Sequence, residues 1–220
     1  MSRALVRSDR PVLLLGAGEV TRPLVKAALR IAPVIVAADG GANMAVAMGL
    51  SPAAVIGDFD SITPDARAAL DPATLHPVPE QETTDFEKCL TRIDAPLILA
   101  LGFTGARSDH ALAVWNALVR HSGRRCLILS RDDLAFVAPT RLSLDVASGT
   151  RVSLFPMAAM RGTSTGLRWP IDAVDFAPDR QIGTSNQAVG PVSLTFSADR
   201  MIVILPRACL DAAIRAVAAP

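Results

Sequence analysis

The stretch Val55-Ile56-Gly57-Asp58-Phe59-Asp60-Ser61 joins the end of an apolar run to a glycine-led turn that carries two carboxylates. The run itself, Ala53–Ile56, is continuously apolar rather than alternating, which is typical of a strand buried on both faces. Similar short runs occur at four other places: Val12–Leu15, Pro33–Ala37, Leu97–Leu101 and Cys126–Leu129. We therefore expect five buried strands in the first part of the chain.

Helix signals lie between most of these strands. Thr63-Pro64 is typical of an N-cap followed by proline at the first helical position. Thr84-Asp85-Phe86-Glu87 matches a capping box at the start of a second helix. The alternation of strands and helices predicts an α/β fold over residues 1–133, with a Rossmann-like, mostly parallel sheet and helices on both faces.

The pattern changes near Arg131, where the helical periodicity ends. Short strand-like pieces follow at Ala135–Ala138, Arg151–Phe155, Pro191–Phe196 and Met201–Leu205. The last two are separated by Ala198-Asp199-Arg200, which is a candidate hairpin turn. We expect a second, smaller all-β domain over residues 134–220, closed by a short helix between Arg207 and Val217.

Composition excludes several classes of protein. Of the 220 residues, 50% are hydrophobic and 20% are charged, and the net charge is +1. This balance excludes a disordered chain and makes bulk attraction to nucleic acid or anionic lipid improbable. The start of the chain, Met1–Arg10, does not resemble a signal peptide, and the apolar runs are too short to span a bilayer. With three scattered cysteines, we expect a cytoplasmic protein that binds neither nucleic acid nor membrane.

Glycines and carboxylates follow several of the expected strands. Ala38-Asp39-Gly40-Gly41 and Gly57-Asp58-Phe59-Asp60-Ser61 each follow a strand, and so does the segment from Gly102 to His110. A further polar loop, Glu80–Asp85, opens a helix. Ligands of open parallel sheets bind at the carboxyl ends of the strands. We therefore expect these four segments to form one site.

Converging carboxylates repel one another unless a cation offsets their charge, and Mg²⁺ is the usual partner of such oxygens. The glycines would allow a polyphosphate to approach the backbone. Arg107 offers a planar fork for phosphate oxygens and Lys88 a mobile point charge. These are the parts of a phosphoryl-transfer site. The Walker A pattern is absent from the sequence, so the site is not a P-loop.

Each residue also has a purely structural interpretation. Asp39 could form only an Asx turn, and Thr84 and Asp85 could be only a helix cap and its first turn. Asp109 could likewise occupy a first helical turn, and Lys88 could be a solvated helix residue. Gly16-Ala17-Gly18 is half of a dinucleotide fingerprint, which is weak support for a nicotinamide or flavin enzyme. Taken together, the residues favour the phosphoryl-transfer site.

Several motifs together resemble the thiamine pyrophosphokinase family. They occur in the family's order: Asp39-Gly40-Gly41-Ala42-Asn43, Gly57-Asp58-Phe59-Asp60-Ser61, Thr84-Asp85-Phe86-Glu87-Lys88, Arg107-Ser108-Asp109-His110, Gly166-Leu167-Arg168-Trp169-Pro170 and Gly183-Thr184-Ser185-Asn186. The resemblance implies an α/β catalytic domain followed by a thiamine-binding β-sandwich domain. It also implies a homodimer whose active sites lie between the catalytic domain of one subunit and the β domain of the other.

The implied reaction is transfer of a pyrophosphoryl group from ATP, the co-substrate, to the hydroxyethyl oxygen of thiamine, releasing AMP. By this resemblance, Asp58, Asp60 and Asp85 would surround Mg²⁺ and the triphosphate. The other residues at the nucleotide would be Asp39, Gly40, Gly41, Thr84, Lys88 and Arg107. Asp109 would lie beside the attacking hydroxyl, either to remove its proton or to orient it. Candidates for contact with thiamine are Gln81, Asp109, Ser185, Asn186 and Trp169.

Some points depart from this family or stay open. Glu80 and Glu82 stand where the family commonly has aspartates. Trp169 could stack on a substrate ring, although a tryptophan before a proline in a β domain is more often part of the core. A pyrophosphokinase for another hydroxymethyl heterocycle, such as a pterin alcohol, is an alternative activity. A catalytically silent nucleotide-binding module is a third interpretation, and the complete set of carboxylates argues against it.

Overall fold

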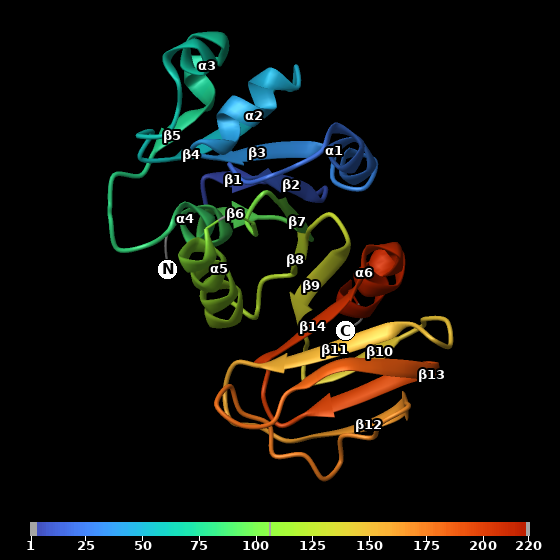
Figure 1. The fold of residues 1–220 in the computed structure, drawn as a ribbon. Helices are drawn as coiled ribbons and strands as arrows, with labels where there is room; N and C mark the ends of the chain where they lie inside the picture. The colour runs from blue at the N-terminus through green and yellow to red at the C-terminus, as the bar shows by residue number, and fades with distance from the viewer. Residues whose placement is uncertain (1–3, 106, 219–220) are drawn as a thin grey trace. The chain divides into compact units, whose positions relative to one another are not determined.

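The computed structural model describes residues 4–105 and 107–218. The protein has a mixed α/β fold with parallel and antiparallel strand pairs (Figure 1). The chain divides into two compact units. The first comprises Met1–Ala117 and Cys126–Arg131, and the second comprises Leu118–Arg125 and Asp132–Pro220.

All strand pairs in the sheet of the first unit are parallel, in the order β8-β7-β2-β3-β4-β5. The strands are β2 (Val12–Leu15), β3 (Val34–Ala38), β4 (Ala54–Gly57), β5 (Leu75–Pro77), β7 (Ile98–Leu101) and β8 (Cys126–Leu129). The five apolar runs predicted as strands all form strands, and β2, β4, β7 and β8 are buried along their whole length. The short β5, which the sequence analysis did not predict, lies at the end of this order.

Among the described residues, five helices belong to this unit. They are α1 (Arg22–Leu29), α2 (Gly41–Ala47), α3 (Pro64–Ala69), α4 (Asp85–Arg92) and α5 (Ser108–Arg120), of which α5 continues into the second unit. Helices α3 and α4 start where the sequence indicates. The hydroxyl of Thr63 accepts a hydrogen bond from the Ala66 amide at 3.3 Å, and that of Thr84 accepts one from the Glu87 amide at 3.4 Å. Both predicted N-caps are thus confirmed. Figure 1 shows α2 and α3 on one side of β3 and β4, and α4 on the other.

Two short elements complete the first unit. The strand β1 (Val6–Arg7) pairs in parallel with β6 (Ile93–Asp94), which directly follows α4. A 3₁₀ turn, Pro72–Thr74, leads from α3 into β5.

The strands of the second unit pair with one another in antiparallel fashion. The strands are β9 (Asp133–Val137), β10 (Arg141–Leu144), β11 (Arg151–Pro156), β12 (Gly162–Leu167), β13 (Gly183–Phe196) and β14 (Met201–Pro206). A 3₁₀ turn, Arg207–Cys209, and helix α6 (Leu210–Ala218) follow. The first half of the long β13 pairs with β11, and its second half lies between β10 and β12. Alternate residues of β10 are buried, as expected for a strand with one face on a core.

The predicted hairpin between the last two strands is wrong. Strand β14 pairs with β11 and β9, so β11 lies between β13 and β14 in the strand order. The reason is that both edges of the second half of β13 are already occupied by β10 and β12. The turn Ala198-Asp199-Arg200 instead passes from one set of strands to the other, and Asp199 accepts a hydrogen bond from the Ser122 hydroxyl at 2.6 Å.

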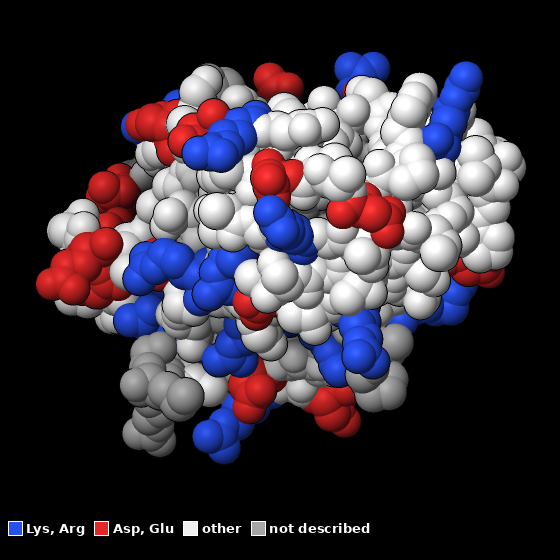
Figure 2. All heavy atoms as spheres, turned by 90° about the horizontal axis from the view of Figure 1, so that it is seen from below, with Lys and Arg blue, Asp and Glu red and all other residues white. Residues whose placement is uncertain are grey.

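Within the described part of the chain, no helix is long and apolar enough to cross a membrane. On the face drawn in Figure 2, acidic and basic side chains are interspersed, and a broad area carries few charges. This distribution is in keeping with the net charge of +1.

Candidate active site

Asp39 lies directly after β3 and is almost completely buried, with 1% of its surface exposed. Its amide donates a hydrogen bond to the Ile56 carbonyl at 3.0 Å, and its Oδ2 accepts one from the Ser61 amide at 3.2 Å. Its Oδ1 is buried and has no hydrogen-bond partner in the described structure. Burial raises the pKa of Asp39, and the charge of Asp85 adds to this effect. An unpaired buried carboxylate oxygen is costly, so a cation is the natural partner for this atom.

Asp58 and Asp60 lie in the turn that follows β4. The Asp60 amide donates to Asp58 Oδ1 at 3.4 Å, and the Ser61 hydroxyl donates to Asp60 Oδ1 at 2.8 Å. Between them, Phe59 has a φ of +69° and packs against an apolar cluster that includes Ala37 and Val55. The phenyl ring therefore fixes the turn to the core, while Asp60 is exposed and Asp58 is partly buried.

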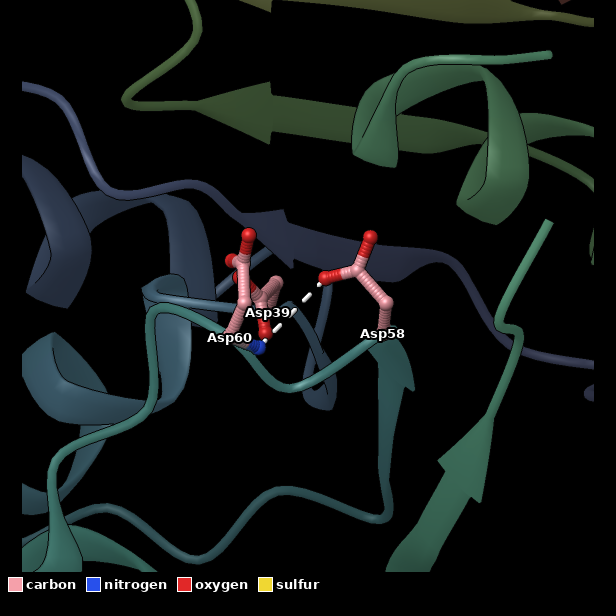
Figure 3. Close-up of side chains that lie close together, drawn as sticks. All are labelled: Asp39, Asp58 and Asp60. Atoms are coloured by element: carbon pink, nitrogen blue, oxygen red, sulfur yellow. Dashed lines mark hydrogen bonds between the residues drawn. The ribbon is translucent and has the colours of Figure 1, made fainter. Parts of the chain in front are cut away.

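The structure brings Asp39, Asp58 and Asp60 together, as Figure 3 shows. One carboxylate oxygen from each residue lies within 4.8 Å of the others. Three negative charges at this spacing repel one another, and oxygen donors of this kind suit a hard divalent cation such as Mg²⁺. The unpartnered Oδ1 of Asp39 fits such an ion, because it is a buried acceptor that no protein group satisfies. Asp85, which the sequence analysis placed at the metal, is outside this group of three.

Asp85 instead contacts Lys88 one turn further along α4. Lys88 Nζ lies 3.4 Å from Asp85 Oδ1 and 3.0 Å from Asp58 Oδ2, and the lysine side chain is only 2% exposed. Burial disfavours the charged ammonium, but the bond to Asp58 and the charge of Asp85 outweigh it, so the pKa of Lys88 is raised. For Asp85, a carboxylic acid, burial favours the neutral form and so raises the pKa. The interpretation of Lys88 as a solvated helix residue is therefore wrong.

The loop before α4 supports the aspartates. Gln81 Nε2 donates to Asp58 Oδ2 at 2.8 Å, and the hydrogen bonds from Lys88 and Gln81 lower the pKa of Asp58. Glu80 accepts hydrogen bonds from its own loop, from the Glu82 amide at 2.9 Å, the Thr83 amide at 3.0 Å and the Thr83 hydroxyl. Glu80 thus stabilises the loop, a role that the sequence analysis missed because it depends on how the loop folds back.

The glycines near the site permit close approach of backbones. Gly41 is the first residue of α2, and a Cβ there would lie 2.1 Å from the Leu15 carbonyl oxygen. Gly40 precedes it as the N-cap, next to Ser61. In the half-fingerprint after β2, the Gly18 amide donates to the Gly102 carbonyl at 2.8 Å. The packing of these two loops accounts for Gly18 without a dinucleotide.

Arg107 and Asp109 lie at the start of α5 and bind each other. Arg107 Nη2 lies 2.7 Å from Asp109 Oδ2, and Nε lies 3.3 Å from Oδ1. Both side chains are 66% exposed. The hydrogen bonds from Arg107 lower the pKa of Asp109 to about 2. A carboxylate with so low a pKa is a weak base.

The remaining predicted residues belong to the second unit. Trp169 is 54% exposed, so the interpretation that it is a core residue is wrong. It lines a pocket of about 180 Å³ together with Thr184 and Asn186. The buried Asn186 amide donates to the Trp169 carbonyl at 2.7 Å and accepts from the Trp169 amide at 3.2 Å, so it holds the tryptophan backbone in place. Ser185 is exposed and has a φ of +62°.

A parallel sheet with carboxylates and a buried lysine at its carboxyl edge is consistent with an enzyme that transfers phosphoryl groups. The family model "Thiamin pyrophosphokinase, catalytic domain" matches residues 25–129, and the model "Thiamin pyrophosphokinase, vitamin B1 binding domain" matches residues 140–203. Thiamine pyrophosphokinase 1 of Oryza sativa subsp. japonica is 32% identical over 185 residues, which cover 69% of this chain and 70% of that protein.

Solved structures are similar in fold. The thiamin pyrophosphokinase from Candida albicans superposes with a TM-score of 0.75 at 17% identity, covering 89% of each chain. The yeast thiamin pyrophosphokinase has a TM-score of 0.74 at 16% identity, covering 97% of this chain and 94% of that one. The chain belongs to the thiamine pyrophosphokinase family, and it is an enzyme of the ATP:thiamine diphosphotransferase type.

Proposed function

We propose that the acidic edge of the first unit transfers the β- and γ-phosphoryl groups of ATP together, as one pyrophosphoryl group, to the hydroxyethyl oxygen of thiamine. The products are thiamine diphosphate and AMP. The observation that carries this assignment is the cluster of Asp39, Asp58 and Asp60 beside the buried Lys88, in a segment that matches the family's catalytic domain. In such a transfer most of the catalysis is positioning and charge neutralisation.

Asp39, Asp58 and Asp60 are the residues that would hold Mg²⁺, with Asp85 beside them at the start of α4. Bound there, the cation would offset the negative charge of the triphosphate. The protein's own contribution is to hold the carboxylates in place: Ser61 fixes Asp39 and Asp60, and Lys88 fixes Asp58.

The remaining residues of the nucleotide site are Gly40, Gly41, Thr84 and Arg107. Gly40 and Gly41 begin α2, where free amide groups favour an anion, and Thr84 caps α4. Arg107 has five N–H donors, of which Asp109 accepts two, so it can also bind a phosphate oxygen. Asp109 orients the thiamine hydroxyl toward the β-phosphorus.

The second unit binds thiamine, and residues 1–133 and 134–220 are the corresponding domains. Trp169 stacks on a ring of thiamine, Ser185 and Asn186 form the adjoining wall, and Gln81 contacts the substrate from the first unit. The exposed tryptophan, the pocket beneath it and the match to the vitamin B1 binding domain support this assignment. The division of β13 between two sets of strands supports a β-sandwich, and the parallel strand order supports a Rossmann-like first domain.

The enzyme acts as a cytoplasmic homodimer in which the catalytic domain of one subunit meets the thiamine-binding domain of the other. This part of the proposal comes from the family resemblance and from the location of the predicted residues on two separate units.

The test is to incubate the purified protein with ATP, Mg²⁺ and thiamine and to identify both products. We expect AMP and thiamine diphosphate in equal amounts. Formation of ADP with thiamine monophosphate would overturn the transfer of two phosphates. ATP binding without turnover of thiamine would point to another hydroxymethyl heterocycle as acceptor.

A further inference from the structure

Lys88 is a buried lysine whose ammonium lies between two carboxylates of the site. Its Nζ lies 3.0 Å from Asp58 Oδ2 and 3.4 Å from Asp85 Oδ1, and only 2% of the side chain is exposed. To bind a phosphate oxygen, the ammonium would have to leave both partners and move out of its buried position. The contacts therefore argue against the sequence prediction that Lys88 binds the nucleotide directly.

The two oxygens of Asp58 face different partners. Oδ2 accepts hydrogen bonds from Lys88 Nζ and from Gln81 Nε2, at 3.0 and 2.8 Å. Oδ1 accepts from the Asp60 amide, as the dashed line in Figure 3 shows, and so faces the turn that carries Asp60. Lys88 and Gln81 thus together hold one oxygen of the Asp58 carboxylate and turn the other toward Asp60.

Lys88 also determines the net charge of the site. The carboxylates of Asp39, Asp58, Asp60 and Asp85 are close enough for the charges of Asp58 and Asp60 to raise the pKa of Asp85. Lys88 is the one buried cationic side chain among the described residues. Its ammonium is therefore a fixed internal cation that offsets part of this negative charge.

We propose that Lys88 is a positioning residue that acts through Asp58 and Asp85, orienting Asp58 and weakening the binding of divalent cations to the empty site. This inference rests on the proposed function of the aspartates as a cation site. Because the ammonium repels a divalent ion held by the same carboxylates, its removal strengthens cation binding. Turnover falls at the same time, because Asp58 Oδ2 then keeps only one of its two side-chain donors, Gln81, and is held less firmly.

The experiment compares Lys88→Met and Lys88→Gln with Lys88→Arg and with Lys26→Met. Lys26 is the only other lysine in the chain and is exposed on α1, so Lys26→Met makes the same charge change away from the site. Mn²⁺ binding is titrated by electron paramagnetic resonance on the nucleotide-free protein. Thermal unfolding, kcat and the KM for ATP are measured on the same samples.

In Lys88→Met and Lys88→Gln we expect the Kd for Mn²⁺ to fall by about tenfold, the size of the effect of a unit charge on a divalent ion a few ångströms away in a water-like dielectric. We expect kcat to fall by about a hundredfold with a much smaller change in KM for ATP, as for an interaction needed in the transition state. Lys88→Arg keeps the positive charge, so its Kd for Mn²⁺ should stay close to that of the unaltered chain. Lys26→Met should have the Kd and kcat of the unaltered chain.

Unchanged or weaker Mn²⁺ binding in both neutral variants would overturn the proposal, and a raised KM for ATP with kcat retained would make Lys88 a phosphate ligand. If Lys88→Met does not fold, Lys88→Gln, which also removes the positive charge, carries the same Mn²⁺ test. The Mn²⁺ titration needs no substrate. The titration can therefore fail or succeed independently of the product assay on the unaltered chain, which tests the proposed reaction.

Discussion

Phe59 shows how one residue can organise two carboxylates. The sequence places Asp58 and Asp60 two positions apart, and that spacing indicated a functional turn. What the spacing did not show is that Phe59 adopts a positive φ of +69° and packs into the core, next to Val55. A non-glycine residue in this conformation is strained and needs support from its surroundings. The burial of the phenyl ring supplies that support.

Asp60→Asn tests the cation site. We expect kcat to fall by about a hundredfold to a thousandfold, the loss typical of a preorganised electrostatic contact, while thermal stability stays nearly unchanged because Asp60 is exposed. The matched control is Asp65→Asn, an exposed aspartate in the first turn of α3. Turnover at the level of the unaltered chain in Asp60→Asn would remove Asp60 from the site.

Asp39→Asn separates stability from activity. Burial raises the pKa of Asp39 in the folded chain. At any pH above that raised pKa, the ionised carboxylate therefore destabilises the fold. The destabilisation disappears as the pH falls below 3.8, the ordinary pKa of an aspartate. We expect the variant to be more stable at pH 8 without Mg²⁺, by about 1–3 kcal/mol, which is the usual cost of an unsatisfied buried group.

The measurement for Asp39→Asn is thermal unfolding at pH 8 and at pH 4, each with and without Mg²⁺. The difference in stability between the variant and the unaltered chain should shrink at pH 4. Mg²⁺ should raise the melting temperature of the unaltered chain more than that of the variant. The variant should also lose its activity. A variant that is less stable than the unaltered chain at pH 8 would contradict the argument.

At the scale of elements, the site depends on how closely α2 approaches the sheet. The helix begins at Gly41 directly after Asp39-Gly40, and its first residue lies against the backbone at the end of β2. A side chain there would touch the Leu15 carbonyl oxygen, which cannot move without disturbing the strand. Gly41 is therefore required by packing, whatever its contact with a nucleotide.

Gly41→Ala tests this packing. A Cβ at 2.1 Å from the Leu15 oxygen must displace α2, and overpacking of this kind costs about 1–3 kcal/mol. We expect the melting temperature to fall by roughly 2–4 °C for each kcal/mol, with a loss of turnover because Asp39 moves with the helix. Gly123→Ala is the control, since a Cβ there meets no atom within 4 Å; an equal effect of both variants would contradict the packing argument.

Strand prediction was accurate for β2, β8, β11 and β14, and it missed β5, β10 and β12. The runs that form β2 and β8 were predicted residue for residue, because continuous apolar sequence leaves little choice. The strand β12, Gly162–Leu167, is rich in glycine and threonine and carries no apolar alternation. It is a strand because β13 offers a free edge, a long-range pairing that local sequence does not contain.

At the scale of the whole molecule, the predicted catalytic residues and the predicted thiamine contacts Trp169, Ser185 and Asn186 belong to different compact units. If the active site is shared between two subunits, a chain with a defective first unit and a chain with a defective second unit can together form one intact active site. Asp60→Asn and Trp169→Ala are suitable partners for such a test, because both side chains are at least partly exposed and their removal leaves the core intact.

We expect mixed dimers of Asp60→Asn and Trp169→Ala to recover about a quarter to a half of the unaltered activity, while each variant alone stays inactive or shows a strongly raised KM for thiamine. The measurement is kcat on dimers carrying two different affinity tags and purified through both. Verified mixed dimers without recovered activity would contradict a shared site.

The sequence by itself determined the buried strands of the first unit, two helix N-caps, the order of the motifs and hence the family, because these depend on local spacing and local chemistry. Only the tertiary structure decided which charges meet. It grouped Asp39 with Asp58 and Asp60, paired Asp85 with a buried Lys88, and left Trp169 exposed beside a pocket. It also separated β13 from β14. Each of these outcomes depends on contacts between segments distant in the chain, and the free energy of burying a charge or pairing a strand edge is set by those contacts rather than by neighbouring residues.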